Sequence, residues 1–401
     1  MDDWTTRLIQ DVMLKTPLTD PKKTPDVSFL YVDVSGVSNK TLEITTSEEL
    51  LGKDAPSRAR RIVSAGDVIF ATVRPTLRRI AIVPDYLDGQ VVSTGYFVFK
   101  PTSEVFNRFL FYYLQTQSFM GKMESLQSGA SYPAVNDTQV KGQSISYPPI
   151  PEQQRIVAIL DQAFADIEKT RANAEQNLKN ARELFDSYLN QVFNQRGEGW
   201  VEYNLKDIVT LKSGTTVKKE LEKTAGDIAY IKVSGMSLEG NEKEITTANT
   251  FLNGTEINSS NVLPVGTTIF PKRGGAIATN KKRITAIPLC IDLNTMGVIP
   301  KKAFILPLYL YFFFKTFDLL SISNGTTIPQ INNYSFDDLK LSVPDIETQE
   351  TLIKKLTQIE TSTDDLSFKY EAKLNSLDEL KKSLLHQAFS GELTKTEGHA
   401  A

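Results

Sequence analysis

Two segments of the sequence carry several basic side chains and no acidic one. Residues 72–83 contain three arginines, and residues 271–283, about 200 positions later, contain five lysines or arginines. These basic residues are Arg74, Arg78, Arg79, Lys272, Arg273, Lys281, Lys282 and Arg283. A basic run usually marks only a solvated surface, but two matched runs in a chain of net charge −3 suit local contacts with nucleic-acid phosphates and base edges.

Two further segments, residues 128–136 and 324–332, combine glycine with small polar residues. Such loops can approach a ligand closely, because Ser and Thr hydroxyls bind phosphate and Asn and Gln amides pair with adenine. The candidate contacts are Ser131, Tyr132, Asn136, Thr326, Thr327, Gln330 and Asn332. A purely structural turn explains these two segments equally well at this stage.

Two lysine pairs, Lys22-Lys23 and Lys218-Lys219, recur at matched positions in the two halves of the chain. We expect these lysines to contact phosphates, a contact that positions DNA without reading its sequence. The remaining candidate DNA contacts are Lys22, Lys23, Ser35, Lys218, Lys219 and Lys232.

The sequence contains few side chains that could catalyse a reaction or bind a metal. One cysteine, Cys290, cannot build a cysteine zinc cluster, and two histidines nearly exclude a histidine-ligated metal site or a Ser-His-Asp triad. The sequence contains neither a Gly-x-x-x-x-Gly-Lys-Ser/Thr phosphate loop nor an Asp/Asn-Pro-Pro-Tyr/Phe adenine-methylation motif. We therefore expect a chain that is not an enzyme, holds no metal and binds no cofactor of its own.

The same composition predicts a cytoplasmic protein. A single cysteine excludes intrachain disulfides and is typical of a reducing compartment. The first four residues include two aspartates and are not followed by the apolar run of a signal peptide. The most apolar stretch, residues 303–314, is too short to span a bilayer and contains Pro307.

The matched segments belong to an internal repeat of about half the chain. Residues 31–38 recur as residues 230–237, residues 66–70 as 266–270, and residues 183–193 as 379–389. Because the order is kept and the offset drifts by only a few residues, we interpret the chain as a tandem duplication. Each copy predicts a strand-rich globular region, with its aromatic-rich segment (residues 106–114 or 308–317) as a buried helix, followed by a long helix.

The two long helices are predicted from residues 152–195 and from the corresponding stretch between Pro344 and Gly391. Apolar residues recur there mostly at steps of three and four, which is typical of a coiled-coil seam. The predicted seam residues are Ile156, Leu160, Ile167, Leu178, Phe185, Leu352, Leu356, Leu366, Leu377 and Leu384. Antiparallel pairing would make the chain a dumbbell with pseudo-twofold symmetry, whereas packing of each helix on its own globular region is the alternative.

The predicted fold class is therefore α+β, with two tandem α/β domains that are each followed by a long helix. The expected bounds are 1–147 for the first globular domain, 148–196 for the central helix, 200–341 for the second globular domain, 344–391 for the C-terminal helix and 392–401 for a flexible tail.

Taken together, these features resemble the specificity subunit of a Type I restriction–modification system, over essentially the whole chain. The resemblance rests on the half-chain repeat, the proline-rich helix entry at residues 148–154, the helix ends at 189–193 and 385–391, and the 66–70 strand followed by Arg74, with Arg273 in its mate. The second helix entry departs from the pattern, with Thr in place of Gln153. That departure predicts two unequal surfaces for docking subunits.

The resemblance implies a mechanism in defence against foreign DNA. Each globular region would be a target-recognition domain that reads one half of a bipartite, asymmetric site in double-stranded DNA. The helices would set the gap between the halves and dock two modification subunits, which use S-adenosylmethionine to methylate adenine. Two restriction subunits, which use ATP with magnesium, would join the complex. Arg74 and Arg273 would be base readers in this scheme.

Two alternatives remain open at this point. The first is the specificity chain of a Type II-like enzyme with a fused methylase–nuclease partner, which the genes beside this one would distinguish. The second is a coiled-coil scaffold that joins two protein-binding heads, which predicts no DNA binding and no effect from removing Arg74 or Arg273.

Overall fold

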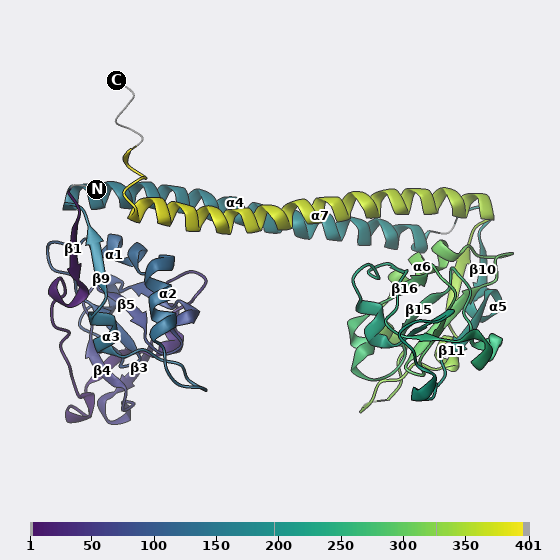
Figure 1. Cartoon of the computed structure of the whole chain (residues 1–401), viewed down its shortest axis with the longest axis horizontal. Helices are drawn as coiled ribbons and strands as arrows, with labels where there is room; N and C mark the ends of the chain where they lie inside the picture. The colour runs from purple at the N-terminus through teal and green to yellow at the C-terminus, as the bar shows by residue number, and fades with distance from the viewer. Residues whose placement is uncertain (1–2, 196, 326, 396–401) are drawn as a thin grey trace, which may run out of the picture. The chain divides into compact units, whose positions relative to one another are not determined.

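The computed structural model describes residues 3–195, 197–325 and 327–395, which belong to two compact units. The first unit lies within residues 1–175 and 371–401, and the second spans residues 176–370. Each unit therefore combines one globular region with one half of each long helix, α4 (Ile150–Asn194) and α7 (Ile346–Phe389) (Figure 1).

The first unit contains one small strand pair and two larger sheets. In the four-stranded sheet the order is β3-β2-β7-β4, and in the three-stranded sheet it is β6-β5-β8. The strands are β1 (Thr5–Leu8), β2 (Ser28–Val32), β3 (Glu48–Leu51), β4 (Ala59–Ile62), β5 (Val68–Ala71), β6 (Ile80–Ile82), β7 (Val91–Ser93), β8 (Tyr96–Phe99) and β9 (Ser144–Tyr147). Its short helices are α1 (Asn107–Tyr113), α2 (Gln117–Leu126) and α3 (Asp137–Lys141).

The second unit repeats this plan. A five-stranded sheet has the order β11-β18-β15-β16-β13, and a three-stranded sheet has the order β14-β12-β17. The strands are β10 (Val201–Asn204), β11 (Val209–Ser213), β12 (Ile228–Ile231), β13 (Glu244–Ile245), β14 (Phe251–Leu252), β15 (Thr268–Pro271), β16 (Arg283–Thr285), β17 (Leu289–Ile291), β18 (Thr295–Pro300) and β19 (Lys340–Val343). Its short helices are α5 (Leu205–Ile208) and α6 (Pro307–Lys315).

In both units the first strand pairs with the last one. β1 pairs antiparallel with β9, and β10 pairs antiparallel with β19. This pairing brings the start of each globular region to the point where its long helix begins. The aromatic-rich segments form α1 and α6, whose buried rings lie in the main core of each unit, as predicted. The observed tandem α/β regions with their long helices confirm the predicted fold class.

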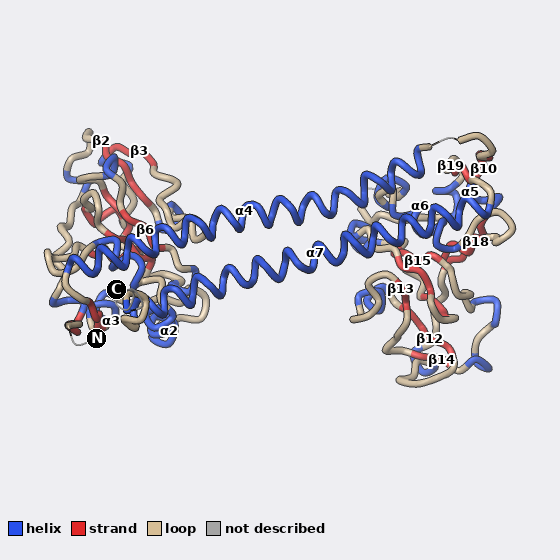
Figure 2. Tube along the Cα trace, turned by 90° about the horizontal axis from the view of Figure 1, so that it is seen from above, coloured by secondary structure: helices blue, strands red, loops and turns tan. Residues whose placement is uncertain are grey.

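The two long helices pair antiparallel within each unit (Figures 1 and 2). In the first unit, Lys381 of α7 forms an ion pair of 2.5 Å with Glu168 of α4, and Asp378 pairs with Arg171. The residue number rises along α4 as it falls along α7, so the helices run in opposite directions. In the second unit, the end of α4 and the start of α7 share one apolar cluster that includes Leu189.

A phenylalanine in the last turn of each helix anchors the helix to a globular region. In the first unit, the ring of Phe389 lies 4.8 Å from that of Phe109 in α1. In the second unit, the ring of Phe193 lies 4.9 Å from that of Tyr309 in α6. Both helices therefore pack on each globular region as well as on one another, which combines the two arrangements considered from the sequence.

A buried glutamine fixes the first turn of each long helix. Gln153 accepts a hydrogen bond from the Phe106 N–H at 2.7 Å and donates to the carbonyls of Glu104 and Pro148, both at 2.8 Å. Gln349 makes the same three bonds, accepting at 2.8 Å from Leu306 N–H and donating at 2.9 Å to Phe304 and Pro344. The predicted departure at the second helix entry is therefore wrong, because Gln349, and not its neighbouring threonine, is the counterpart of Gln153.

Five of the ten predicted seam residues are buried and four are partly buried, whereas Leu366 is exposed. Leu356 is fully buried, whereas the side chain of Leu366 is 39% exposed. Thr363 and Glu360 are buried on α7 instead, because the inward-facing side of the helix follows a different register through this stretch. Leu366 is therefore removed from the seam.

The start of the predicted flexible tail is held in place. The Leu393 N–H donates to the Gln387 carbonyl at 3.0 Å, and the Leu393 side chain packs against the core of the first unit. The end of that predicted tail, residues 396–401, lies outside the described residues.

Candidate nucleic-acid interface

A closed hairpin loop, residues 128–134, stands out on the surface of the first unit. Ser128 and Ala134 close the loop with two backbone hydrogen bonds of 3.0 and 2.9 Å. Gly129 has a φ of +105°, and a Cβ there would lie 3.0 Å from the Tyr132 carbonyl oxygen, so the loop requires glycine. The turn leaves Tyr132 71% exposed at the tip. We call this loop the first tip loop.

The first tip loop pairs with the start of the basic segment, about 60 residues away in the sequence. The Arg74 N–H donates to the Pro133 carbonyl at 2.7 Å, and the Val135 N–H donates to the Thr72 carbonyl at 2.9 Å. One surface therefore combines two segments that the sequence predicted separately as candidate contacts. One segment is basic, and the other is rich in small polar residues.

Arg74 has an unusual backbone at this surface. Its φ is +51°, in the left-handed region, where a non-glycine residue costs about 1–2 kcal/mol. Its guanidinium lies over the Tyr132 ring at 4.9 Å, and its Nη2 donates to the Ser131 carbonyl at 3.3 Å. Strain of this kind persists where the surroundings hold it, often at functional sites. The arrangement presents an exposed guanidinium beside an exposed aromatic ring.

The second unit contains the matching loop, closed by Asn324 and Gln330 through two backbone hydrogen bonds of 2.8 Å each. We call residues 324–330 the second tip loop, of which Thr326 lies outside the described residues. Gly325 has a φ of +95°, and a Cβ there would lie 2.9 Å from the Ile328 carbonyl oxygen. The second tip loop also pairs with a basic segment, since the Ile331 N–H donates to the Lys272 carbonyl at 2.8 Å.

The two sites differ in the residue of the basic segment whose N–H donates to the tip loop. Gly274 donates to the Pro329 carbonyl at 2.8 Å, as Arg74 donates to the Pro133 carbonyl, and it also has a positive φ, of +71°. Gly274 is therefore the counterpart of Arg74, and Arg273 lies one position earlier. Arg74 and Arg273 therefore occupy different positions in the two sites, although both side chains are exposed beside a tip loop.

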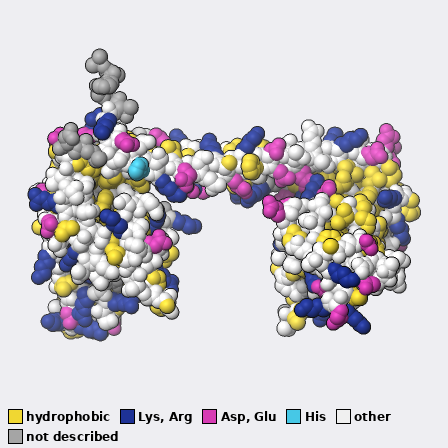
Figure 3. Space-filling view, viewed as in Figure 1, with side chains coloured by type: hydrophobic (Ala, Val, Ile, Leu, Met, Phe, Trp, Pro, Cys, Tyr) yellow, Lys and Arg dark blue, Asp and Glu magenta, His cyan; other side chains and the backbone are white. Residues whose placement is uncertain are grey.

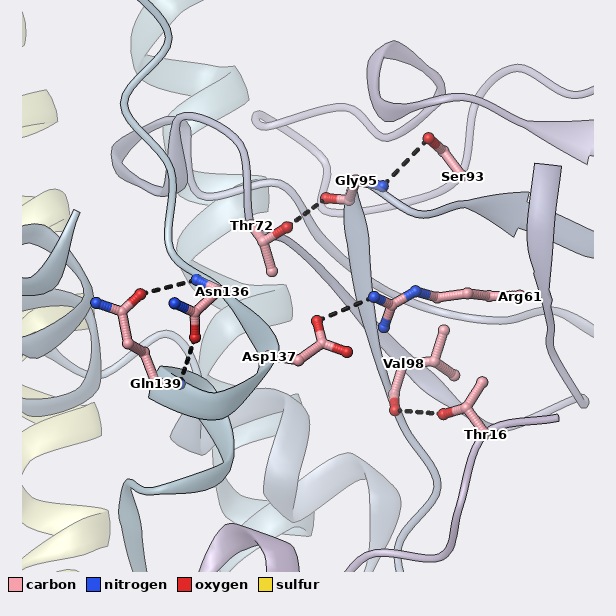
Figure 4. A network of polar contacts seen from close by, with 9 residues as sticks. All are labelled: Thr16, Arg61, Thr72, Ser93, Gly95, Val98, Asn136, Asp137 and Gln139. Carbon is pink, nitrogen blue, oxygen red and sulfur yellow. Dashed lines mark hydrogen bonds and ion pairs between the residues drawn. The ribbon is translucent and has the colours of Figure 1, made fainter. Parts of the chain in front are cut away.

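The asparagines after the tip loops have structural partners. Asn136 caps α3, accepting from the Gln139 N–H at 2.9 Å, while its own N–H donates to Gln139 Oε1 at 2.8 Å (Figure 4). In the second unit, Asn332 Oδ1 accepts from Gln330 Nε2 at 3.1 Å, and Asn332 Nδ2 donates to the Tyr334 hydroxyl at 3.0 Å. A paired contact with adenine would break these bonds, so the structure disfavours both asparagines as readers.

Figure 4 also shows what holds the base of the first tip loop. Asp137, in the first turn of α3, forms an ion pair of 2.9 Å with Arg61 of β4. The Thr72 hydroxyl donates to the Gly95 carbonyl at 3.0 Å. These contacts connect the basic segment and α3 to the two sheets, so the loop projects from a braced support.

Several predicted basic contacts are occupied inside the fold. Lys282 is only 5% exposed, donates to the Phe317 carbonyl at 2.7 Å, and has its pKa lowered by burial to about 8. Arg79 donates to the Val34 carbonyl at 2.8 Å, and Arg283 donates to the Met236 carbonyl at 3.2 Å. Lys281 bonds the Ser237 hydroxyl. Arg79, Lys281 and Arg283 therefore tie each basic hairpin to the turn after β2 or β12. Lys282 is instead buried against the segment after α6, so its prediction as a phosphate contact is wrong.

Two further lysines of the second unit are partly engaged. Lys272 Nζ donates to the Ser213 hydroxyl at 2.9 Å, and burial followed by the charge of Arg273 lowers the pKa of Lys272. Lys232 forms an ion pair of 2.6 Å with Glu222.

The other predicted contacts lie on the surface. Arg78, with a φ of +53°, donates to Gln117 Oε1 at 3.3 Å and is exposed. The remaining exposed candidates are Lys22, Lys23, Ser35, Ser131, Lys218, Lys219 and Thr327. On the face drawn in Figure 3, Lys and Arg side chains gather at the end of each unit away from the helices.

A basic cavity of about 710 Å³ adjoins Arg78 in the first unit. Its acidic lining residue among those described, Asp378, is paired with Arg171. The basic lining residues are Lys40, Arg78, Lys122, Lys381 and Lys382, of which Lys381 is paired with Glu168 and Lys382 with Glu379. Sequence reasoning missed Lys40 and Lys122, because they are isolated in the sequence and join this surface only through the fold.

The structure adds two observations on other functions. Among residues 3–195, 197–325 and 327–395, no three His, Cys, Asp or Glu side chains are grouped as a metal site requires. Over the same part of the chain, none of the helices has the length and apolar character needed to cross a membrane.

Comparison with known proteins identifies related chains. The specificity subunit of Type I restriction enzyme HindI from Haemophilus influenzae is 30% identical over 196 residues, which cover 47% of this chain and 41% of that protein. The specificity subunit of Type I restriction enzyme MjaIX from Methanocaldococcus jannaschii is 20% identical over 427 aligned positions, covering 98% of this chain and 94% of that protein.

Solved structures agree with these relatives. A chain from a study of complex assembly and conformational transition of the type I R-M system matches with a TM-score of 0.87 at 25% identity, covering 98% of this chain and 99% of that one. The HsdS subunit from Thermoanaerobacter tengcongensis matches with a TM-score of 0.67 at 25% identity, covering 98% and 97%.

The comparisons confirm the predicted resemblance to a specificity subunit, the non-catalytic DNA-recognition component, over the Type II-like and scaffold alternatives. The family model for the Type I restriction modification DNA specificity domain matches twice, at residues 1–176 and 197–376. Since these matches cover most of both repeats, this chain belongs to the Type I restriction modification DNA specificity family.

Proposed function

We propose that this chain reads a bipartite, asymmetric site in double-stranded DNA, with one half-site for each unit. The observation that carries the proposal is the matched pair of tip loops, each closed by two backbone hydrogen bonds and each paired with a basic segment. A hairpin of this kind fits the major groove, where every base pair has a distinct pattern of donors and acceptors. The site is asymmetric because the two loops differ at corresponding positions. Gly274 corresponds to Arg74, and Ile328 corresponds to Tyr132.

In this proposal the surface residues divide into two roles. Arg74 and Arg273 lie where the tip loops meet the basic segments, and they read base edges. Gln330, whose Nε2 donates to Asn332 Oδ1 at 3.1 Å, is disfavoured as a reader for the same reason as Asn332. The exposed lysines contact phosphates and hold the DNA in register. The basic cavity of the first unit extends the phosphate track from Arg78 towards α7. The globular regions, residues 1–147 and 200–341, act as the target-recognition domains.

The long helices, within residues 148–196 and 344–391, set the gap between half-sites and dock partner subunits. Exposed apolar side chains support the docking role, because a helix surface in water is otherwise polar. In the second unit Phe368 is 74% exposed, Leu184 58% and Leu366 39%. The partners are two modification subunits, which use S-adenosylmethionine, and two restriction subunits, which use ATP with magnesium. The complex works in the cytoplasm.

The direct test is genome-wide mapping of methyladenine in cells that make this chain with its modification subunit. We expect a bipartite motif with a fixed gap that disappears when the gene for this chain is deleted. Replacing residues 200–341 with those of a relative should change one half of the motif and leave the other. Absence of any motif, with the modification subunit shown active alongside another specificity subunit, would contradict the proposal.

A further inference from the structure

The tip of each loop exposes a large apolar side chain at the same position. Tyr132 is 71% exposed and Ile328 is 59% exposed, and each follows its positive-φ glycine by three residues. Single exposed apolar residues are common on protein surfaces. Here the exposure recurs at one position in two loops of the same backbone geometry, while the residue type differs. This pattern fits a contact surface whose chemistry varies from one half-site to the other.

We propose that Ile328 and Tyr132 enter the major groove and that each reads a thymine of its half-site through the thymine methyl group. This inference rests on the proposed function, since it needs DNA bound at the tip loops. It makes Ile328, which sequence reasoning did not single out, a specificity-determining residue.

Groove dimensions favour this mode of reading. The two arms of a hairpin lie about 4.8 Å apart, and their side chains bring the width close to the roughly 12 Å of the major groove. The minor groove, at roughly 6 Å, is too narrow for a hairpin. Within the major groove the thymine C5-methyl is the apolar group on the base edges. An isoleucine side chain has no hydrogen-bonding atom, so the methyl group is the feature that it can recognise.

The residues around Tyr132 differ from those around Ile328, which suits recognition of two different half-sites. In the first unit the Arg74 guanidinium lies over the Tyr132 ring, which limits the orientations of the ring. In the second unit Gly274 takes the place of Arg74, and a Cβ built on either Gly274 or Gly275 would meet no atom within 4 Å. Position 274 therefore carries no side chain at the second tip that corresponds to the Arg74 guanidinium over Tyr132.

The test uses the full chain in complex with its modification subunit and duplexes that carry the mapped motif. Each thymine of the second half-site is replaced in turn by deoxyuridine, which removes only the methyl group. We expect one replacement to weaken binding of the unmodified complex about fourfold, the value for one buried methyl-sized group. Ile328→Ala should weaken binding to the thymine duplex by a similar factor and should be insensitive to that replacement.

The matched control is Val265→Ala, because Val265 is 50% exposed and lies before β15, at the opposite end of that strand from Arg273. It should keep both the affinity and the sensitivity to deoxyuridine. In the first unit, Tyr132→Ala and Tyr86→Ala form the corresponding pair, since Tyr86 is 58% exposed beyond β6.

Three results would overturn the inference while leaving the proposed function intact. They are specific binding that no deoxyuridine replacement weakens, an Ile328→Ala complex that keeps the full sensitivity, and a second half-site without thymine on either strand. Failure of the unmodified complex to distinguish its motif from unrelated DNA would instead contradict the proposed function, and the inference with it.

Discussion

Replacing Arg74 with glycine should separate the stability of the first unit from its DNA binding. Arg74 has a φ of +51° at a position where the second unit has Gly274 with a φ of +71°. Arginine therefore occupies a conformation that glycine adopts without strain. The variant Arg74→Ala keeps the strained backbone but loses the side chain, so the two variants form a matched pair.

The expected magnitudes follow from three opposing effects. Release of the left-handed strain stabilises Arg74→Gly by about 1–2 kcal/mol. The greater freedom of glycine in the unfolded chain costs about 0.5–1 kcal/mol. Loss of the exposed contact with the Tyr132 ring costs about 0.5–1 kcal/mol in both variants. Arg74→Gly should therefore stay close to the stability of the unmodified chain, and Arg74→Ala should be about 0.5–1 kcal/mol less stable than Arg74→Gly.

Both variants should bind DNA equally poorly. A base-reading arginine contributes about 1–3 kcal/mol to discrimination, which corresponds to a loss of about 5- to 150-fold in affinity for the cognate site. The motif should relax at one position, while the salt dependence of binding changes little. Gly274→Ala, the reciprocal change, should destabilise the second unit by about 1 kcal/mol, because no side-chain contact compensates for the strain.

Thermal unfolding measures the stability of each variant, and fluorescence anisotropy with a labelled cognate duplex measures its affinity for DNA. A difference of 0.5–1 kcal/mol corresponds to about 1–4 °C in Tm for a unit of this size. The reasoning is refuted if Arg74→Ala is as stable as Arg74→Gly, or if either variant keeps full affinity and an unchanged motif.

Three further predictions follow from the placement of other side chains. Burial lowers the pKa of Lys282 from its ordinary 10.5 to about 8, so the unfolded state binds more protons than the folded state between about pH 8 and 10.5. The free energy of unfolding should therefore rise with pH across that window, and Lys282→Met should flatten this part of the pH profile. Leu356→Asp should destabilise the second unit by about 3–5 kcal/mol, whereas Leu366→Asp should change its free energy of unfolding by less than about 0.5 kcal/mol; equal denaturation midpoints would contradict the revised seam. Lys22→Ala and Lys218→Ala should each weaken binding to all sequences and reduce the slope of log K against log salt by about 1, and an unchanged slope would remove these lysines from the phosphate track.

Much of the architecture follows from the sequence alone. The half-chain repeat predicts two similar units, because a duplicated sequence folds into a duplicated structure. The steps of three and four between apolar residues predict α4 and α7, and the aromatic-rich segments predict the buried helices α1 and α6. The half-chain repeat, the proline-rich helix entry and the helix ends resemble those of Type I specificity subunits, and the comparisons confirm that resemblance. All of these signals are local patterns or direct repetitions, which need no knowledge of distant contacts.

The tertiary structure decided which of the candidate residues can meet a ligand. Lys282 and Arg74 belong to matching basic segments, yet one is buried and the other lies on the surface, because burial depends on the strands packed around each hairpin. The counterpart of Arg74 is Gly274 rather than Arg273, because backbone pairing with the tip loop sets the register. Asn136 caps a helix, and Leu366 leaves the seam. Each outcome depends on partners far away in the sequence, and for that reason only the folded chain determines them.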